Sequence, residues 1–256
     1  MNNTLAADKA VGMAVNIDQL TLRYNDAVHP LFKHLDVTLP AGKWTCLLGK
    51  SGCGKTTLLR HLAGLLEDNV DWAGSITTSN ALPLGGNLAY MAQQDLLLPW
   101  LNVIDNVCLS ARFGSSQKTD KQKAMAMLDA VGLADKSNAM PNQLSGGMRQ
   151  RVALARTLMQ DKPLVLMDEP FSALDAVTRH KLQSLSATLL ADKTVLLITH
   201  DPQEALRLGH HIYMMAGFPA SIKPLPVPLS IPPRQFDGEL AALQQGIINE
   251  LENDYV

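Results

Sequence analysis

A stretch rich in glycine and lysine follows an apolar run in the first quarter of the chain. Its sequence is GKSGCGKTT at 49–57, directly after WTCLL at 44–48. Glycines permit backbone angles that turn successive N–H groups toward an anion, and a helix beginning at Lys55 would add its unpaired N–H groups and dipole. Lys55 can supply charge to β- and γ-phosphates, and the Thr56 hydroxyl can bind Mg²⁺. The residues expected to form this phosphate-binding loop are Gly49, Lys50, Ser51, Gly52, Cys53, Gly54, Lys55, Thr56 and Thr57.

Polar residues also follow two later apolar runs. PLVLMDEP at 163–170 is typical of a buried strand that ends in Asp168 and Glu169, and TVLLITHD at 194–201 repeats the pattern with His200. Ligands gather at the carboxyl ends of parallel strands. Asp168 could hold Mg²⁺ through water, Glu169 could polarise an attacking water, and His200 could hydrogen-bond a γ-phosphate. Taken alone, each residue could equally be a solvated polar group at a strand end.

A second glycine-rich stretch, LSGGMRQR at 144–151, precedes a helical pattern. Ser145 is a favourable residue for the N-cap of that helix, and Gly146 and Gly147 follow it. The sequence therefore predicts a second helix start that can bind an anion.

Strand and helix patterns alternate along most of the chain, which predicts an α/β core with a largely parallel sheet. The helical block from about 95 to 160 is expected to be inserted into that core. Strands are expected at 14–24, 32–39, 43–48, 163–167, 194–199 and 211–215, short strands and turns over 72–91, and helices at 55–63, 101–112, 119–131, 147–160, 176–191 and 202–208.

The end of the chain has a different composition. Residues 219–233 carry six prolines, which favours an extended segment over a helix. Leu240, Leu243, Ile247 and Leu251 then recur at helical spacing, which predicts an amphipathic helix. The expected division is a main domain over 14–216 and a C-terminal extension over 217–256.

Composition excludes several classes of function. The chain has 256 residues, 46% of them hydrophobic, and a net charge of −2, so nothing in its charge points to nucleic acid as a partner. Cys46, Cys53 and Cys108 lack the spacing of a zinc site or a disulfide framework, and indicate free thiols in a reducing compartment. No run of about 18 apolar residues and no leader sequence is visible, so neither a membrane span nor a signal peptide is expected.

Read in order, these motifs resemble the nucleotide-binding subunits of ATP-binding cassette (ABC) transporters, over about residues 14–216. Gln93, in AYMAQQDLLLPW, resembles the Q-loop glutamine that meets Mg²⁺ and the attacking water, and its spacing to Pro99 favours it over Gln94. Tyr24 stands where the family places an aromatic that stacks on adenine, although it could also be an ordinary strand residue. GKSGCGKTT resembles the Walker A loop, LSGGM the signature loop, LVLMDE the Walker B strand, SALD at 172–175 the D-loop with Asp175, and His200 the switch histidine.

The resemblance implies a P-loop ABC ATPase fold, with a mixed or parallel sheet, an antiparallel β lobe and an inserted helical subdomain. It implies ATP and Mg²⁺ as cofactors, with Mg²⁺ held by Thr56, Gln93 and Asp168. Two copies would pair head to tail as a homodimer, peripheral on the cytoplasmic face of the inner membrane, with permease subunits and an extracytoplasmic substrate-binding protein. The implied catalytic residues are Glu169, His200 and Gln93, and the residues implied to act on the partner's ATP are Ser145, Gly146 and Gly147.

Some features depart from the family pattern or narrow it. Met148 replaces the usual signature glutamine. LSGGMRQR and LLPW at 97–100 resemble the branch that imports nitrate, sulfonates, taurine or the hydroxymethylpyrimidine precursor of thiamine. Leu98, Trp100 and Leu101 are either permease contacts or core of the helical lobe. A soluble ABC-type ATPase remains the alternative, whereas a P-loop nucleotide kinase would leave LSGGM, SALD and His200 unexplained.

Overall fold

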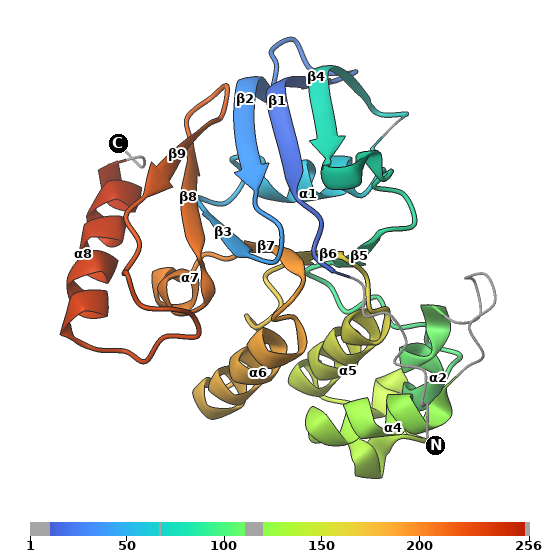
Figure 1. The fold of residues 1–256 in the computed structure, drawn as a ribbon. Coiled ribbons are helices and arrows are strands. Elements are labelled where there is room, and N and C mark those ends of the chain that lie inside the picture. Colours follow the sequence, from blue (N-terminus) through green and yellow to red (C-terminus); the bar gives the residue numbers. More distant parts are fainter. Residues whose placement is uncertain (1–10, 67, 111–119, 254–256) are drawn as a thin grey trace, which may run out of the picture.

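Two sheets form the frame of the protein in a computed structural model that describes residues 11–66, 68–110 and 120–253 (Figure 1). The smaller sheet is antiparallel, in the order β2-β1-β4, with β1 at Val15–Tyr24, β2 at Phe32–Leu39 and β4 at Val70–Thr78. Alternation of buried and exposed residues along β2 matches a sheet with one face on the core. The expected antiparallel β lobe is therefore confirmed.

The larger sheet has six strands in the order β5-β6-β7-β3-β8-β9. All neighbours in it are parallel except β8 and β9, which are antiparallel. Every residue of β3, β6 and β7 is buried, which explains why these strands appear in the sequence as unbroken apolar runs. The strands are β3 (Trp44–Leu48), β5 (Leu88–Met91), β6 (Leu164–Asp168), β7 (Thr194–Ile198), β8 (His211–Ala216) and β9 (Ser221–Leu225).

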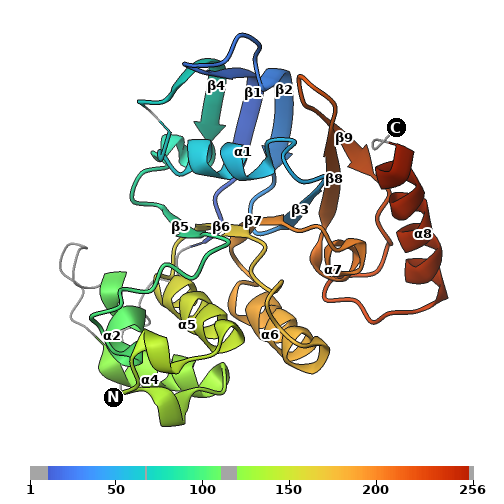
Figure 2. The same cartoon turned by 180° about the vertical axis from the view of Figure 1, so that it is seen from behind.

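Helices cover both faces of the larger sheet and create two apolar cores. Helix α1 (Lys55–Leu62) lies between the two sheets, where Leu58, Leu59 and Leu62 are buried (Figure 1). Helices α5 (Gly146–Met159), α6 (Ala176–Leu189) and α7 (Pro202–Leu208) lie on the opposite face, as Figure 2 also shows. Side chains of β6 alternate accordingly, with Leu164 and Leu166 in the α1 core and Val165 and Met167 in the other.

Within the described residues, the expected helical insertion contains α2 (Val103–Val107), α4 (Lys121–Ala130) and α5, with 3₁₀ turns between α4 and α5. Helix α2 begins two residues later than the predicted 101–112, and a turn at Cys108 interrupts the predicted helix before residues 109 and 110, which are helical. Asn102 caps its start through the Asp105 N–H, and the Asn106 side chain bonds backbone carbonyls on the N-terminal side, including that of Leu98. Residues 111 and 112 of that prediction, and residue 119 of the next, lie outside the described residues. The 3₁₀ turns within the described residues are η1 (Ser79–Ala81), η2 (Ala134–Lys136) and η3 (Pro141–Gln143).

The C-terminal extension is ordered against the core. Its proline-rich part is extended, as predicted, but five of its residues form β9, an edge strand that accommodates Pro224. Arg234 is buried and donates to the carbonyls of Leu206, Gly209 and Pro228, which fastens the extension to the end of α7. Helix α8 (Gly238–Asn253) then buries Leu240 and Ile247, as its spacing predicted. No helix within the described ranges is long and apolar enough to cross a membrane.

Candidate active site

The loop at 49–54 turns tightly between β3 and α1. A Cβ atom at Gly49 would lie 2.3 Å from the Met215 carbonyl oxygen, and one at Gly54 would lie 2.7 Å from Cε1 of Phe32. The φ angle of Gly54 is +110°, in a region that side chains disfavour. Both positions therefore need glycine because the loop lies too close to its neighbours for a Cβ atom, and not only because glycine permits unusual backbone angles.

The Lys55 ammonium group lies inside this loop. Its Nζ donates to the carbonyl oxygens of Gly49 and Lys50, at 2.7 and 2.8 Å, and the side chain is buried. A positive charge is thereby fixed at the mouth of a cavity of about 200 Å³. This cavity is lined by Ser51, Gly52, Gly54, Lys55, Thr56, Thr57, Gln93, Glu169 and Ile198.

Asp168, the last residue of β6, lies beneath the cavity and is buried. Its Oδ2 has no hydrogen-bond partner among the described residues. Burial raises the pKa of the Asp168 carboxyl, and a hydrogen bond from the Thr56 side chain opposes the rise. A buried carboxylate oxygen with a spare acceptor, next to a hydroxyl and a phosphate loop, fits Mg²⁺, which uses one or two carboxylates plus phosphate oxygens. Asp168 and Thr56 are the residues that would hold it.

Three polar side chains converge at the carboxyl ends of adjacent strands. The Glu169 Oε2 lies 3.3 Å from Gln93 Nε2 and 3.1 Å from His200 Nδ1. Gln93, Glu169 and His200 follow β5, β6 and β7, which are neighbours in the sheet. The backbone φ of Glu169 is +48°, a strained value that places the carboxylate at the cavity. The structure thus brings together three residues that the sequence placed far apart.

Tyr24 ends β1 beside the start of α1. Its hydroxyl oxygen is 3.1 Å from the Thr57 Oγ1, and its side chain is half-buried. The residue therefore contacts the predicted phosphate loop. Its ring borders the helix that carries Thr56 and Thr57.

The second glycine-rich stretch forms the start of α5, away from the Lys55 cavity in the described chain. Ser145 is its N-cap and accepts a hydrogen bond from the Met148 N–H at 3.3 Å, as predicted. Ser145 and Gly146 are exposed, whereas the Met148 side chain packs against the apolar core. Partial burial of the Met148 side chain therefore explains why an apolar residue fits this position.

Asp175 of the SALD stretch caps α6. Its carboxylate accepts from the Thr178 N–H at 3.0 Å, and these hydrogen bonds lower the pKa of the Asp175 carboxyl. The residue is exposed beside Ala173 and Ala176. Its structural role is thus to start α6, and the side chain stays accessible.

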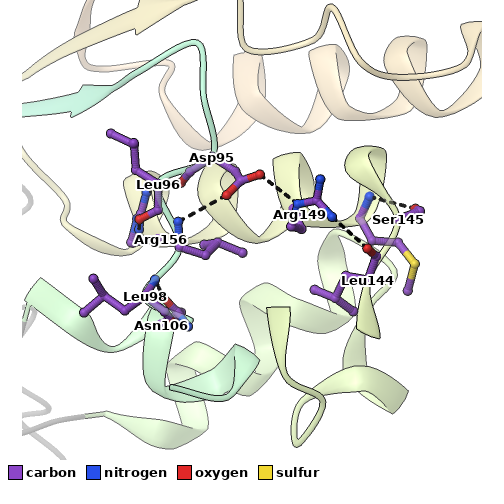
Figure 3. A network of polar contacts seen from close by, with 10 residues as sticks. Asp95, Leu96, Leu98, Asn106, Leu144, Ser145, Arg149 and Arg156 are labelled. Carbon is purple, nitrogen blue, oxygen red and sulfur yellow. Dashed lines mark hydrogen bonds and ion pairs between the residues drawn. The ribbon is translucent and has the colours of Figure 1, made fainter. Parts of the chain in front are cut away.

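Sequence reasoning missed two arginines of α5 that hold the segment after Gln93. Arg149 donates to the Asp95 carboxylate at 2.9 Å, and Arg156 donates to the backbone carbonyls of Asp95 and Leu96 (Figure 3). No local pattern reveals a pair separated by 54 positions. Only the fold brings these side chains together.

Comparison with known proteins identifies the class. The sequence profile of the ABC transporter family matches residues 32–172. A Haemophilus influenzae protein described as an uncharacterized ABC transporter ATP-binding protein is 43% identical over 242 residues, covering 93% of this chain and 98% of that protein. The aliphatic sulfonates import ATP-binding protein SsuB 1 of Paracoccus denitrificans is 41% identical over 209 residues, 81% of each chain.

Solved structures agree with the sequence relatives. The ATP-binding cassette MJ0796, in a dimeric post-hydrolysis state bound to ADP and Pi, aligns with a TM-score of 0.71 and 27% identity, over 87% of this chain and all of that one. This chain belongs to the ABC transporter family. It has the ABC ATPase fold, binds ATP, and couples ATP hydrolysis to transport. The sequence-based resemblance, the fold class and the ATPase activity are therefore confirmed.

Proposed function

We propose that this chain is the ATP-hydrolysing subunit of an importer for a small solute, and that it works as a head-to-tail homodimer with a separate permease. The observation that carries the proposal is that Gln93 and Glu169 line the cavity that holds Lys55, while His200 lies 3.1 Å from the Glu169 carboxylate. Several relatives are named as import proteins, which favours this function over a soluble ABC-type ATPase.

The loop at 49–57 grips the triphosphate in this proposal. Backbone N–H groups of Gly49, Lys50, Ser51, Gly52, Cys53 and Gly54 face the phosphates with Lys55, Thr56 and Thr57. Lys55 exchanges its bonds to the two loop carbonyls for bonds to phosphate oxygens. Tyr24, at the edge of the loop, stacks on the adenine ring. Thr56, Asp168 and Gln93 would hold Mg²⁺, whose charge would neutralise the phosphates.

Glu169 is the general base. Its carboxylate accepts the proton of a water that attacks the γ-phosphate, and Gln93 and His200 orient that water from either side. The strained backbone of Glu169 keeps the carboxylate in this place before ATP arrives. Catalysis here rests on positioning and charge, as expected for phosphoryl transfer.

The exposed start of α5 acts on the ATP of the other protomer. Ser145, Gly146 and Gly147 present a helix N-terminus to the partner's γ-phosphate, and Asp175 lies near the same interface. ATP therefore favours the closed dimer, and loss of the γ-phosphate releases it. The dimeric assembly of the MJ0796 cassette with ADP and Pi supports this arrangement.

Residues near α2 provide the contact with the permease. Trp100 is 70% exposed, which argues against its being core of the helical lobe, whereas Leu98 and Leu101 are partly buried. An exposed indole bounded by partly buried leucines suits an inserted helix of a membrane partner. The complex would lie on the cytoplasmic face of the inner membrane and receive solute from an extracytoplasmic substrate-binding protein.

We assign the solute to the sulfonate-like class, which includes taurine and nitrate as small anions. Names of relatives at about 40% identity support a sulfonate, and the alternative is a thiamine pyrimidine precursor. Uptake of a labelled alkanesulfonate and of hydroxymethylpyrimidine by cells with and without the chain separates the two. Uptake of neither solute by the complete transporter would contradict the assignment.

Replacing the buried ammonium group tests the nucleotide site. Lys55→Ala should weaken ATP binding at least tenfold, measured by calorimetry on the full chain, because the fixed positive charge is lost. Lys223→Ala, which removes a lysine paired with Glu250 far from the loop, is the matched control. Unaltered ATP affinity in the Lys55 variant would remove the proposed phosphate cradle.

Copurification tests the transport role. The tagged chain should retain a multi-span permease in mild detergent, and Trp100→Ala should lower the recovered permease severalfold while leaving ATP binding intact. If the Trp100→Ala variant retained the permease fully, the permease contact would lie elsewhere on the protein.

A further inference from the structure

Helix α5 contacts the segments that follow β5 and β6, which carry Gln93 and Glu169, through two consecutive residues. Arg149 donates from Nε to the Asp95 carboxylate at 2.9 Å, two residues beyond Gln93. The next residue, Gln150, is buried and donates to the Pro170 carbonyl oxygen at 3.2 Å, one residue beyond Glu169. One turn of helix is therefore attached to both strand exits that form the site.

The Gln93–Glu169 contact closes these attachments into a ring. Gln93 Nε2 lies 3.3 Å from Glu169 Oε2. The backbone joins Gln93 to Asp95, Arg149 to Gln150, and Glu169 to Pro170. The contact ring consists of Gln93, Asp95, Arg149, Gln150, Pro170 and Glu169.

The signature loop is attached to the same ring. Arg149 uses a second nitrogen to donate to the Leu144 carbonyl oxygen at 2.9 Å, directly before Ser145 (Figure 3). Arg156, two turns further along α5, donates to the carbonyls of Asp95 and Leu96, so the segment after Gln93 is held at two points. A displacement of Gln93 relative to Glu169 therefore displaces Asp95, Arg149 and the start of the signature loop together.

We propose that Arg149 and Gln150 are positioning residues that link each protomer's own catalytic carboxylate to the signature loop it presents to its partner. The proposal rests on the proposed function, because it needs the head-to-tail dimer and the role of Glu169. Arg149 touches neither ATP nor the reacting atoms and acts through Asp95 and Leu144. By thermodynamic linkage, the effect runs both ways, so the state of one ATP site alters the other.

The link predicts an effect that a local role would not produce. If Arg149 only supported the neighbouring signature loop, its loss would harm the partner's site alone. Because the ring also fixes Gln93 against Glu169, its loss also harms the protomer's own site. The two roles are separable in mixed dimers, where each protomer carries different substitutions.

Mixed dimers of the full chain, purified through two different tags, provide the test. In the first dimer one protomer carries Glu169→Gln and the other carries Arg149→Met. The competent site then combines the Arg149→Met protomer's own Glu169 with an intact signature loop from its partner. Relative to a dimer with Glu169→Gln alone, kcat should fall about fivefold or more, with the KM for ATP within twofold. An unchanged kcat overturns the proposal.

A second mixed dimer places Glu169→Gln and Arg149→Met in the same protomer. Its competent site has an intact ring of its own and an altered signature loop opposite, and kcat should fall here too. If kcat fell in this second dimer only, Arg149 would support the neighbouring signature loop and nothing else, which would contradict the link. Lys223→Met, which breaks a C-terminal ion pair, is the control and should leave kcat unchanged.

A charge-reversed pair distinguishes loss of the Asp95–Arg149 ion pair from misfolding caused by a single substitution. Asp95→Arg combined with Arg149→Asp should restore at least part of the kcat lost in Arg149→Asp, because the pair is re-formed with opposite polarity. Absence of any rescue would also count against the link. A Glu169→Gln homodimer that hydrolyses ATP at the normal rate would instead contradict the proposed function, and the link with it.

Discussion

The two regions that would grip one ATP in the proposed dimer are built differently. The phosphate loop and the polar residues after β5, β6 and β7 are placed by backbone: strand ends, a tight loop and a helix start fix them around the fully buried strands β3, β6 and β7. The signature loop is carried by α5 and held to the first region by side chains, chiefly Arg149, Gln150 and Arg156. A substitution in the first region should therefore alter the chemical step or the stability of the fold. A substitution in the second region should alter the position of the signature loop.

Removing the carboxylate of the first region should have the largest effect. Glu169→Gln keeps the size of the side chain but abolishes proton acceptance, so kcat for ATP should fall about 10²-fold or more. ATP affinity should stay within severalfold, because Glu169 is not a phosphate ligand. Steady-state hydrolysis and equilibrium nucleotide binding measure the two quantities.

The dimer gives an independent check of that prediction. Since ATP persists in the variant, size-exclusion chromatography should show a larger dimer fraction with ATP than with ADP. Turnover equal to that of the unaltered chain would remove Glu169 as the base. A reduced ATP affinity with normal turnover at saturation would make it a binding residue instead.

Matched glycine substitutions sharpen the comparison. Gly49→Ala forces a Cβ to within 2.3 Å of a backbone oxygen of β8 and should cost about 3 kcal/mol or more of unfolding free energy. Gly147→Ala in α5 meets the Ala173 oxygen at 3.2 Å and gains helix propensity, so its effect should stay within about 1 kcal/mol. Urea unfolding measures both, and equal losses would contradict the distinction between the two regions.

Local patterns predicted the first region well. The unbroken apolar runs at β3, β6 and β7 arise because both faces of the sheet are covered, and the polar residues that end the β6 and β7 runs are recognisable in the sequence. Glycines of the loop are diagnostic because backbone approach leaves no room for a Cβ. Periodicity and motif order were therefore sufficient for the elements, and for the residues expected at their ends.

The contacts of the second region could not be predicted in the same way. Nothing in the local sequence distinguishes Arg149 from an arginine that is exposed to solvent. Its partner Asp95 lies on a segment without regular structure. The start of α2 was predicted too early because the Asn106 side chain satisfies the carbonyls of Leu98 and Leu101, which no apolar pattern records. The strand β9 was missed because its proline lowers strand expectation, although an edge position tolerates it.

Glu204 of α7 lies beside the first region, near Glu169 and His200, and is a buried carboxyl held by side chains. It faces Gln183 at 2.9 Å, Thr199, Asp201 and Arg179, and burial raises its pKa to about 7. The folded chain therefore retains a proton between pH 4.5 and about 7 that the unfolded chain releases. Stability should fall on the order of 3 kcal/mol as pH rises through this window and level off above it.

Glu204→Gln isolates that contribution. The amide keeps an acceptor for Gln183 but cannot ionise, so the fall in unfolding free energy between pH 4.5 and 7 should be reduced by about the same amount. Denaturant melts at several pH values measure it. A pH profile parallel to that of the unaltered chain would assign the dependence to other groups.

The smallest stability effect is expected at the cap of the signature helix. Ser145→Ala removes the acceptor for the Met148 N–H and should cost about 1 kcal/mol, or a Tm lower by about 2–4 °C. Ser145→Gly should cost only a few tenths of that, because glycine tolerates the cap position. If position rather than stability governs this region, both variants should lower kcat for ATP by similar factors despite their different melting temperatures. A loss of kcat that tracked Tm would mean that the signature loop matters only through the stability of α5, which would erase the difference between the two regions.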